Sequence, residues 1–86
     1  MKSIIITVSD KNRRFLVDVE VPTEEPGGKV TEDLFEVLNH QDEDLRLNTY
    51  YHGLYLERQK RLLKDRETLA QAGVWNGDYL TVVSRM

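Results

Sequence analysis

The chain has 86 residues, no cysteine and a formal net charge of −3. This length fits a single domain (residues 1–86), and 40% hydrophobic with 31% charged residues is typical of a globular protein. The missing cysteines exclude disulfides and thiolate metal sites, and the net negative charge argues against nucleic-acid binding. No apolar run approaches the roughly 20 residues of a membrane span, so we expect a cytoplasmic protein without membrane insertion.

Charge is uneven along the chain. Residues 18–44 contain ten acidic residues and one basic residue, whereas residues 57–67 contain five basic and three acidic residues. Two interpretations stay open: both segments are ordinary solvated surface, or they form a polarised docking surface.

Alternating apolar residues predict a β-hairpin at the N-terminus. The first strand carries Ile4, Ile6 and Val8 on one side. A polar turn over residues 9–12 follows, and the alternation resumes with Phe15, Val17, Val19 and Val21. Pro22 is expected to end the second strand, because proline cannot donate to a sheet.

A helix is expected from Lys29 to about His40. Its apolar stripe consists of Val30, Leu34, Val37 and Leu38. Phe35 flanks this stripe and would rim the core. Glu32 and Asp33 would occupy the first turn, where the helix dipole favours anions.

Two glycines, Gly27 and Gly28, precede this helix. They lack the other residues of a phosphate-binding fingerprint, so a phosphate site is not indicated. We interpret the pair as a flexible connection between hairpin and helix.

The segment from Leu47 to Leu56 is rich in aromatic and apolar residues and is expected to form one long or bulged strand. Gly53 would be its kink. The bulge leaves open which face of the strand Tyr50 and His52 occupy. A turn and a short return strand over residues 61–63 would follow.

Residues 68–83 read as a capped helical turn, a reversal and a strand. Thr68 can cap the turn, and Gly73 can end it in a left-handed conformation. The pair Asn76-Gly77 suits the positive φ angles of a tight reversal. Trp75 at its tip is expected to pack over the loop, with contact to a partner as the alternative. The core positions of this stretch are Leu69, Val74, Leu80 and Val82.

The element order is that of an α+β fold with a β-grasp architecture. It runs ββαββ, with a short helical turn before the last strand. Because a helical crossover permits parallel pairing, the last strand is expected to lie centrally and parallel to the first. In this register the outward residues of the last strand are Tyr79, Thr81 and Val83. If Thr49 and Tyr51 face the core, Tyr50 and His52 join them.

Residues in the last third of the chain resemble ubiquitin-like proteins. The run from Leu63 to Leu69 resembles the ubiquitin segment that enters its helical turn. The pattern Thr-Leu-Ala-x-Ala-Gly-Val-x-x-Gly-Asp-x-Leu, at residues 68–80, is similar to the bacterial YukD/EsaB family. It also resembles the ubiquitin-like domain of type VII secretion membrane subunits. The resemblance implies a ubiquitin-like fold and an accessory role in a type VII-like secretion system, with membrane or ATPase components as protein partners.

Ubiquitin and the related sulfur carriers act through a C-terminal Gly-Gly, which this chain lacks. It ends Val83-Ser84-Arg85-Met86, so conjugation and sulfur transfer are not expected. One alternative is a small ubiquitin-like subunit of a multicomponent enzyme such as a monooxygenase. A degenerate sulfur carrier or modifier is the other, and the terminal residues argue against it.

No catalytic constellation is indicated. His40 and His52 alone fall short of the three or four ligands of a metal site, and no serine has a nucleophile-elbow context. We therefore expect a binding protein without catalytic residues, metal or cofactor. Its expected protein-binding residues, on the open face of the sheet, are Tyr50, His52, Tyr79, Thr81 and Val83. Ordinary residues covering a solvated sheet face explain this set equally well.

Overall fold

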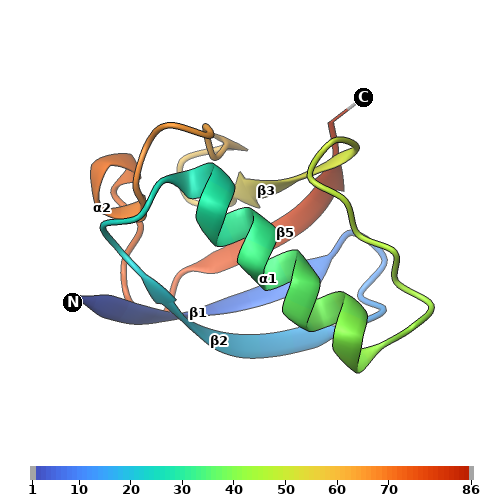
Figure 1. Ribbon diagram of the computed structural model, residues 1–86. Helices are drawn as coiled ribbons and strands as arrows, with labels where there is room; N and C mark the ends of the chain where they lie inside the picture. The colour runs from blue at the N-terminus through green and yellow to red at the C-terminus, as the bar shows by residue number, and fades with distance from the viewer. Residues whose placement is uncertain (1, 86) are drawn as a thin grey trace.

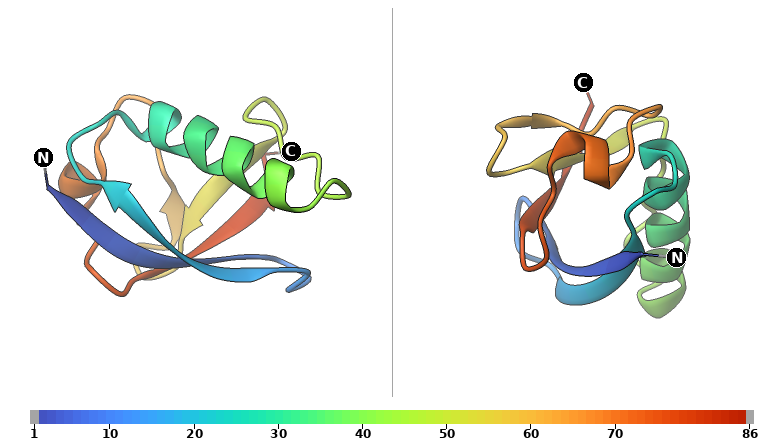
Figure 2. Two further views of the ribbon diagram at one scale, coloured as in Figure 1. Left: turned by 60° about the horizontal axis from the view of Figure 1, so that its bottom comes forward. Right: turned by 90° about the vertical axis from the view of Figure 1, so that its left-hand side faces the viewer.

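The computed structural model describes residues 2–85, which form one mixed sheet and two helices. The strands are β1 (Ser3–Asp10), β2 (Leu16–Pro22), β3 (His52–Leu56), β4 (Arg61–Leu62) and β5 (Tyr79–Ser84), and the helices are α1 (Gly27–Gln41) and α2 (Leu69–Ala72). The sheet order is β2-β1-β5-β3-β4, with β5 parallel to β1 and antiparallel to β3. Helix α1 crosses one face of the sheet (Figure 1), and the sheet curves around it (Figure 2). The α+β class and the central, parallel last strand are confirmed.

The hydrophobic core lies between α1 and the sheet. Six inward residues of β1, β3 and β5 are at most 3% exposed, and they are Ile6, Val8, Leu54, Leu56, Leu80 and Val82. Leu69 and Val74 are also buried in this cluster, so all four core positions expected in residues 68–83 are confirmed. Alternation along β5 therefore sets which of its side chains remain outside.

Helix α1 buries a face rotated from the expected stripe. Phe35 is 2% exposed and belongs to the core, whereas Val37 is 49% exposed. The expectations for these two residues are wrong. The polar Thr31 lies within the buried face, so the apolar residues alone indicate the wrong centre for that face. The Thr31 hydroxyl donates to the Gly27 carbonyl at 2.8 Å, so its burial leaves no unsatisfied donor.

The N-terminus of α1 is tied to residues 64–67. The amide of Gly27 donates to the Glu67 carbonyl at 2.7 Å, and that of Gly28 donates to the Asp65 carbonyl at 3.0 Å. A Cβ on Gly27 would lie 2.5 Å from the Lys64 carbonyl oxygen, so a larger residue requires a backbone shift. The interpretation of the glycines as a flexible connection is therefore wrong: they permit close packing.

Helix α1 begins at Gly27, before the expected Lys29, so Glu32 and Asp33 lie beyond its first turn. That turn holds no acidic residue, and Asp33 instead forms an ion pair with Lys29, with 2.7 Å between Oδ2 and Nζ. Both side chains are more than half exposed, so the pair stabilises the helix little.

Residues 42–51 form a loop and not the first half of a strand. Leu45 and Leu47 are buried, and the Asn39 side chain makes hydrogen bonds of 2.8 and 2.7 Å to the backbone of Leu47. The side-chain amide of Asn39 therefore makes the backbone hydrogen bonds that a neighbouring strand would make. Strand β3 begins only at His52, and Gly53 lies inside it opposite Val83 in an unbroken register, so the expected long strand with a kink is wrong.

The stretch around α2 follows the sequence signals closely. Thr68 caps α2 in a capping box, and Gly73 ends it with a φ of 75°. In the reversal only Gly77 has a positive φ, 89°, as the third residue of a type II turn requires. The Asn76 side chain instead accepts a 2.8 Å hydrogen bond from the Ile5 amide, which ties the reversal to β1.

Truncation of a buried residue in the central strand tests this core. We expect Leu80→Ala to lower the free energy of unfolding by about 2–5 kcal/mol, because it removes packed methyl groups and leaves a cavity. Val37→Ala, an equally conservative change outside the core, should stay within about 0.5 kcal/mol of the wild type. Urea unfolding measures both, and equal stability of Leu80→Ala and wild type would contradict the register of β5.

Acidification tests the link between β4 and α2. Arg61 donates to both carboxylate oxygens of Glu67, at 2.6 and 2.8 Å, and the Lys64 amide donates to one of them at 2.7 Å. These hydrogen bonds, that of Arg61 foremost, lower the pKa of Glu67 from 4.5 to about 2. Because the folded pKa is depressed, the stabilisation is complete above about pH 4.5 and is lost as the pH falls towards 2.

The matched variant for this test is Glu67→Gln, which cannot titrate. The difference in unfolding free energy between wild type and variant should shrink by about 2–3 kcal/mol between about pH 6 and about pH 2. Urea titrations at several pH values measure this difference. A difference that stays constant over the interval would show that Glu67 is not the linked group.

Candidate protein-binding surface

The face of the sheet opposite α1, here called the open face, carries three of the expected binding residues. Tyr79, Thr81 and Val83 alternate with buried Leu80 and Val82 along β5 and point away from the core. All three are half-buried, because neighbouring strands flank them on both sides. The sequence alternation indicates this placement correctly, and their role in binding stays a prediction.

Tyr50 and His52 do not lie on the open face. Tyr50 belongs to the turn before β3. His52 shares the core side of β3 with Leu54, and its ring contacts that of Phe35 edge to face, with 6.3 Å between the centroids. The expected placement of both residues is therefore wrong, because β3 begins only at His52 and leaves Tyr50 in the turn, and the register that buries Leu54 also turns His52 inward.

Sequence reasoning missed Tyr55, which is an outward residue of β3. It pairs with Thr81 on one side and with Leu62 on the other, so aromatic and aliphatic side chains continue across the open face. Alternation from the apolar residues on either side would have placed Tyr55 outward. The kink expected at Gly53 leaves this register open in the sequence.

The other half of the open face, on β1 and β2, mixes apolar and polar side chains. Ile5 and Leu16 are both more than half exposed. Beside them the Thr7 hydroxyl donates to the Asp18 carboxylate at 2.7 Å. This half therefore has the composition of a polar rim next to the more apolar β5–β3 half.

A hollow of about 440 Å³ adjoins Tyr79 and Thr81 near the β1–β2 turn. The Thr81 hydroxyl donates to the Glu57 carboxylate, and Arg14 donates to Asp10 through its amide at 2.6 Å and its Nε at 2.5 Å. Burial alone would raise the pKa of Asp10, but the hydrogen bonds and charge of Arg14 outweigh it and lower that pKa. The rim of the hollow is thus made of polar groups that are already held in place.

Trp75 lies between α2 and β5 with its ring against Arg58. The guanidinium carbon is 3.8 Å from the ring centroid, and Arg58 also donates to the Asp78 carboxylate at 3.2 and 2.9 Å. The hydrogen bond from Arg58 is the largest cause of the lowered pKa of Asp78. The ring remains 64% exposed, so the expectation that Trp75 packs over the loop is wrong.

Metal and membrane signals are absent from the described part of the chain. Within residues 2–85 no group of three or more His, Cys, Asp or Glu could hold a metal ion. In the same range, no helix has both the length and the apolar character needed to span a bilayer. The two histidines lie apart in the fold, His40 in the last turn of α1 and His52 against Phe35.

Solved structures of ubiquitin-like domains share this fold. The ubiquitin-like domain of the Mycobacterium tuberculosis type VII secretion system protein ECCD1 is 24% identical, with a TM-score of 0.75 over 98% of this chain and 100% of that one. The EccD5 ubiquitin-like domain from Mycobacterium xenopi is 16% identical, with a TM-score of 0.76 over 98% and 96%. Caldiarchaeum subterraneum ubiquitin is 21% identical, with a TM-score of 0.71 over 99% and 96%. The fold is thus a ubiquitin-like β-grasp.

Family membership comes from the sequence. No curated protein matches the chain significantly. A family model described as "WXG100 protein secretion system (Wss), protein YukD" matches residues 3–82, which is nearly the whole chain. The protein therefore belongs to the YukD family of ubiquitin-like proteins, a family linked to type VII secretion.

Proposed function

We propose that this protein is a non-catalytic, cytoplasmic interaction component of a type VII-like secretion system. It binds a membrane or ATPase component of that system through the open face of its sheet. The match to the YukD family and the fold shared with two EccD domains support the link to secretion. The proposal for the docking site rests on one observation, the continuous surface formed by Tyr55, Tyr79, Thr81 and Val83.

The composition of this surface suits a protein interface. Interface cores are enriched in aromatic residues, and the β5–β3 half of the open face carries Tyr55 and Tyr79, with the Glu57 carboxylate held at its edge by Thr81. Its residues stand on paired strands, so binding would order little backbone and cost little conformational entropy. The polar side chains of β2 would then form a rim at one edge.

The electrostatics support binding over catalysis. Within residues 2–85 each carboxylate with a resolved pKa shift is held by an arginine, and each shift is downward. A general acid needs a raised pKa near neutrality, and these pairs give the opposite. Their role is therefore structural, and they are Asp10–Arg14, Glu67–Arg61 and Asp78–Arg58.

Alanine substitutions on β5 test the docking site. Tyr79→Ala should weaken binding to the partner by about 1–2 kcal/mol or more, as at an interface hot spot, and Val83→Ala should weaken it less. The measurement is calorimetry with the purified cytosolic regions of the membrane and ATPase subunits of the cognate secretion system. Val37→Ala, which alters an exposed residue of α1, is the matched control and should bind like the wild type.

Two results would refute the proposal. In the first, neither secretion component binds the wild-type protein. In the second, one component binds, but Tyr79→Ala and Val83→Ala keep full affinity although their melting curves show that both variants are folded. Loss of affinity in Val37→Ala alone would move the docking site to the helix.

A further inference from the structure

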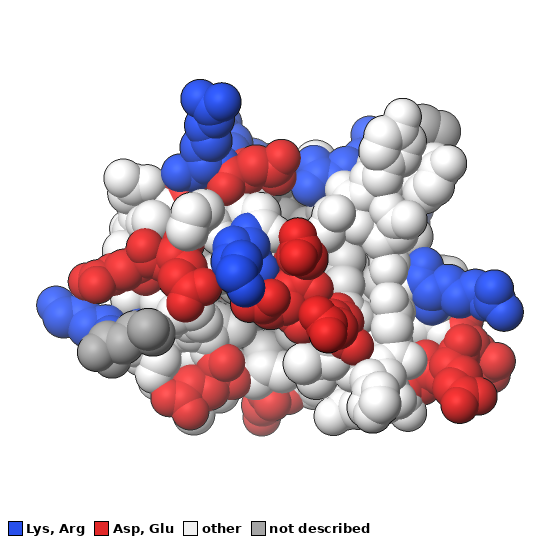
Figure 3. Space-filling model, in the orientation of Figure 1, with Lys and Arg blue, Asp and Glu red and all other residues white. Residues whose placement is uncertain are grey.

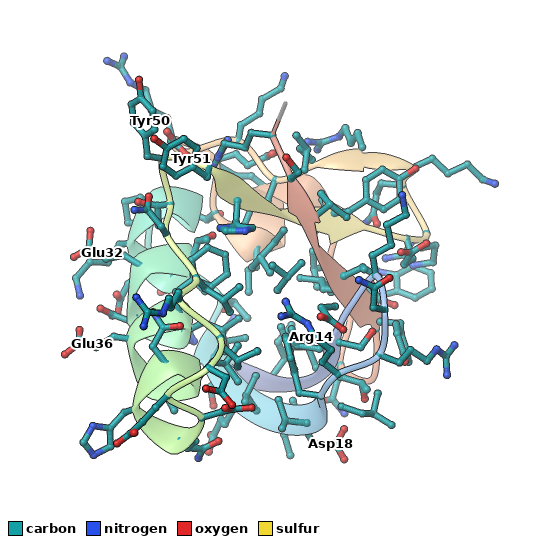
Figure 4. The ribbon with its side chains drawn as sticks, turned by 90° about the vertical axis from the view of Figure 1, so that its right-hand side faces the viewer. Arg14, Asp18, Glu32, Glu36, Tyr50 and Tyr51 are labelled. Carbon is teal, nitrogen blue, oxygen red and sulfur yellow. The ribbon has the colours of Figure 1, made fainter. Side chains whose placement is uncertain are left out.

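Two neighbouring tyrosines protrude from the turn of residues 48–51, here called the tyrosine turn. Tyr50 is 78% and Tyr51 is 52% exposed, and their rings meet edge to face with 5.0 Å between centroids. Figure 4 shows both rings at the edge of the molecule, pointing outward. Adjacent exposed aromatic rings leave a large apolar area in water, which is characteristic of a binding surface.

The tyrosine turn is held rigidly from two sides. Asn48 accepts a 2.7 Å hydrogen bond from the Tyr50 amide through its side chain and a 2.8 Å bond from the His52 amide through its carbonyl. Arg85 donates from Nε to the carbonyls of Thr49 and His52, at 2.9 Å each. The backbone that carries the tyrosines is therefore fixed, and binding them costs little backbone ordering entropy.

A groove of about 380 Å³ adjoins this turn and follows α1, and we call it the α1 groove. Its lining comes from α1, from the residue before the tyrosine turn and from the first half of that turn, and consists of Glu32, Phe35, Glu36, Asn39, Leu47, Asn48 and Thr49. The two hydrogen bonds from Asn39 to Leu47 fix one wall against the other. The groove is thus a built feature of the fold.

The charged side chains that line the α1 groove are both acidic. Glu32 and Glu36 project from the same side of α1 (Figure 4), and the acidic side chains over this helix lie around a basic one, beside a neutral band (Figure 3). Neither carboxylate takes part in an ion pair within residues 2–85. Like charges four residues apart repel and weaken a helix, so a cation placed opposite them is favoured.

We propose that the α1 groove and the tyrosine turn together bind a basic, extended segment of a partner protein. Lysine or arginine at alternate positions fits, because carboxylates four residues apart on a helix are separated by about 6 Å. Alternate side chains of an extended chain are separated by about 6.6–6.8 Å. A further cation can lie over the tyrosine rings. This surface is distinct from the open face, so the protein can contact two segments at once.

Other occupants fit the α1 groove less well. Nucleic acids and anionic membranes carry phosphate charge, which Glu32 and Glu36 repel. The basic segment 57–67 of a second copy is a poorer occupant, because its Arg58 and Arg61 already form ion pairs with carboxylates of their own chain.

The test is an amide-shift titration of the full chain with a synthetic peptide. The peptide is end-capped and alternates lysine with threonine, and the matched peptide carries glutamate in place of lysine. The lysine peptide should shift amides of residues 32–39 and 48–51 in a saturable way and leave residues 79–83 unaffected. The glutamate peptide should shift neither set.

Matched variants separate contact from general attraction. Glu32→Gln with Glu36→Gln should weaken lysine-peptide binding about tenfold, whereas Glu20→Gln with Glu24→Gln, the same charge change elsewhere, should alter it less than about twofold. Tyr50→Ala, which changes no charge, should weaken it about two- to fivefold, and Tyr50→Phe should not.

Several outcomes would overturn the proposal. They are unsaturable shifts spread over all acidic residues, equal losses in both glutamine pairs, an unchanged affinity in Tyr50→Ala, and shifts confined to the sheet. Shifts in residues 57–67 that grow with protein concentration would assign the α1 groove to a second copy instead. Binding of secretion components through the open face is measured separately, so the two proposals fail independently.

Discussion

The contact between the N-terminus of α1 and residues 63–67 is the constraint on which the rest of the structure depends. The first amides of a helix lack partners within it, and here Gly27 and Gly28 donate theirs to the carbonyls of Glu67 and Asp65. Glu67 in turn holds β4 through Arg61. Because Gly27 carries no Cβ, the helix can approach residues 63–67 closely at this point. The same few atoms therefore fix the helix, β4 and the start of α2 relative to one another.

The position of the helix decides which surfaces are left for binding. With α1 over one face, the outward residues of the sheet remain uncovered, and the central place of β5 puts Thr81 between Ser9 and Tyr55. The loop of residues 42–51 then runs back along the exposed flank of α1 and is clamped there by Asn39. The sheet face and the α1 groove are consequently two fixed surfaces of one rigid domain.

Local signals explain why residues 68–83 could be predicted. A cap at Thr68, a left-handed glycine and strict alternation each depend on neighbours in sequence, and the structure follows all three. The structure of residues 42–51 could not be predicted from such local signals. It depends on hydrogen bonds to the side chain of Asn39, and no periodic pattern in the sequence indicates them. The same loop misled the placement of Tyr50 and His52. The face of α1 was misjudged because Thr31 satisfies its hydroxyl within the helix and is buried like an apolar residue.

That loop also gives the domain its second kind of surface. If residues 47–51 continued β3 in its register, Tyr51 would extend the aromatic surface of the sheet, and both binding regions would attract the same apolar segments. Because the chain enters the sheet only at His52, Tyr50 and Tyr51 lie instead in a turn beside the α1 groove, which Glu32 lines. One surface then selects apolar contacts and the other selects cations. Partners of unlike chemistry compete little for the two sites, so a small domain can hold two segments in a defined arrangement.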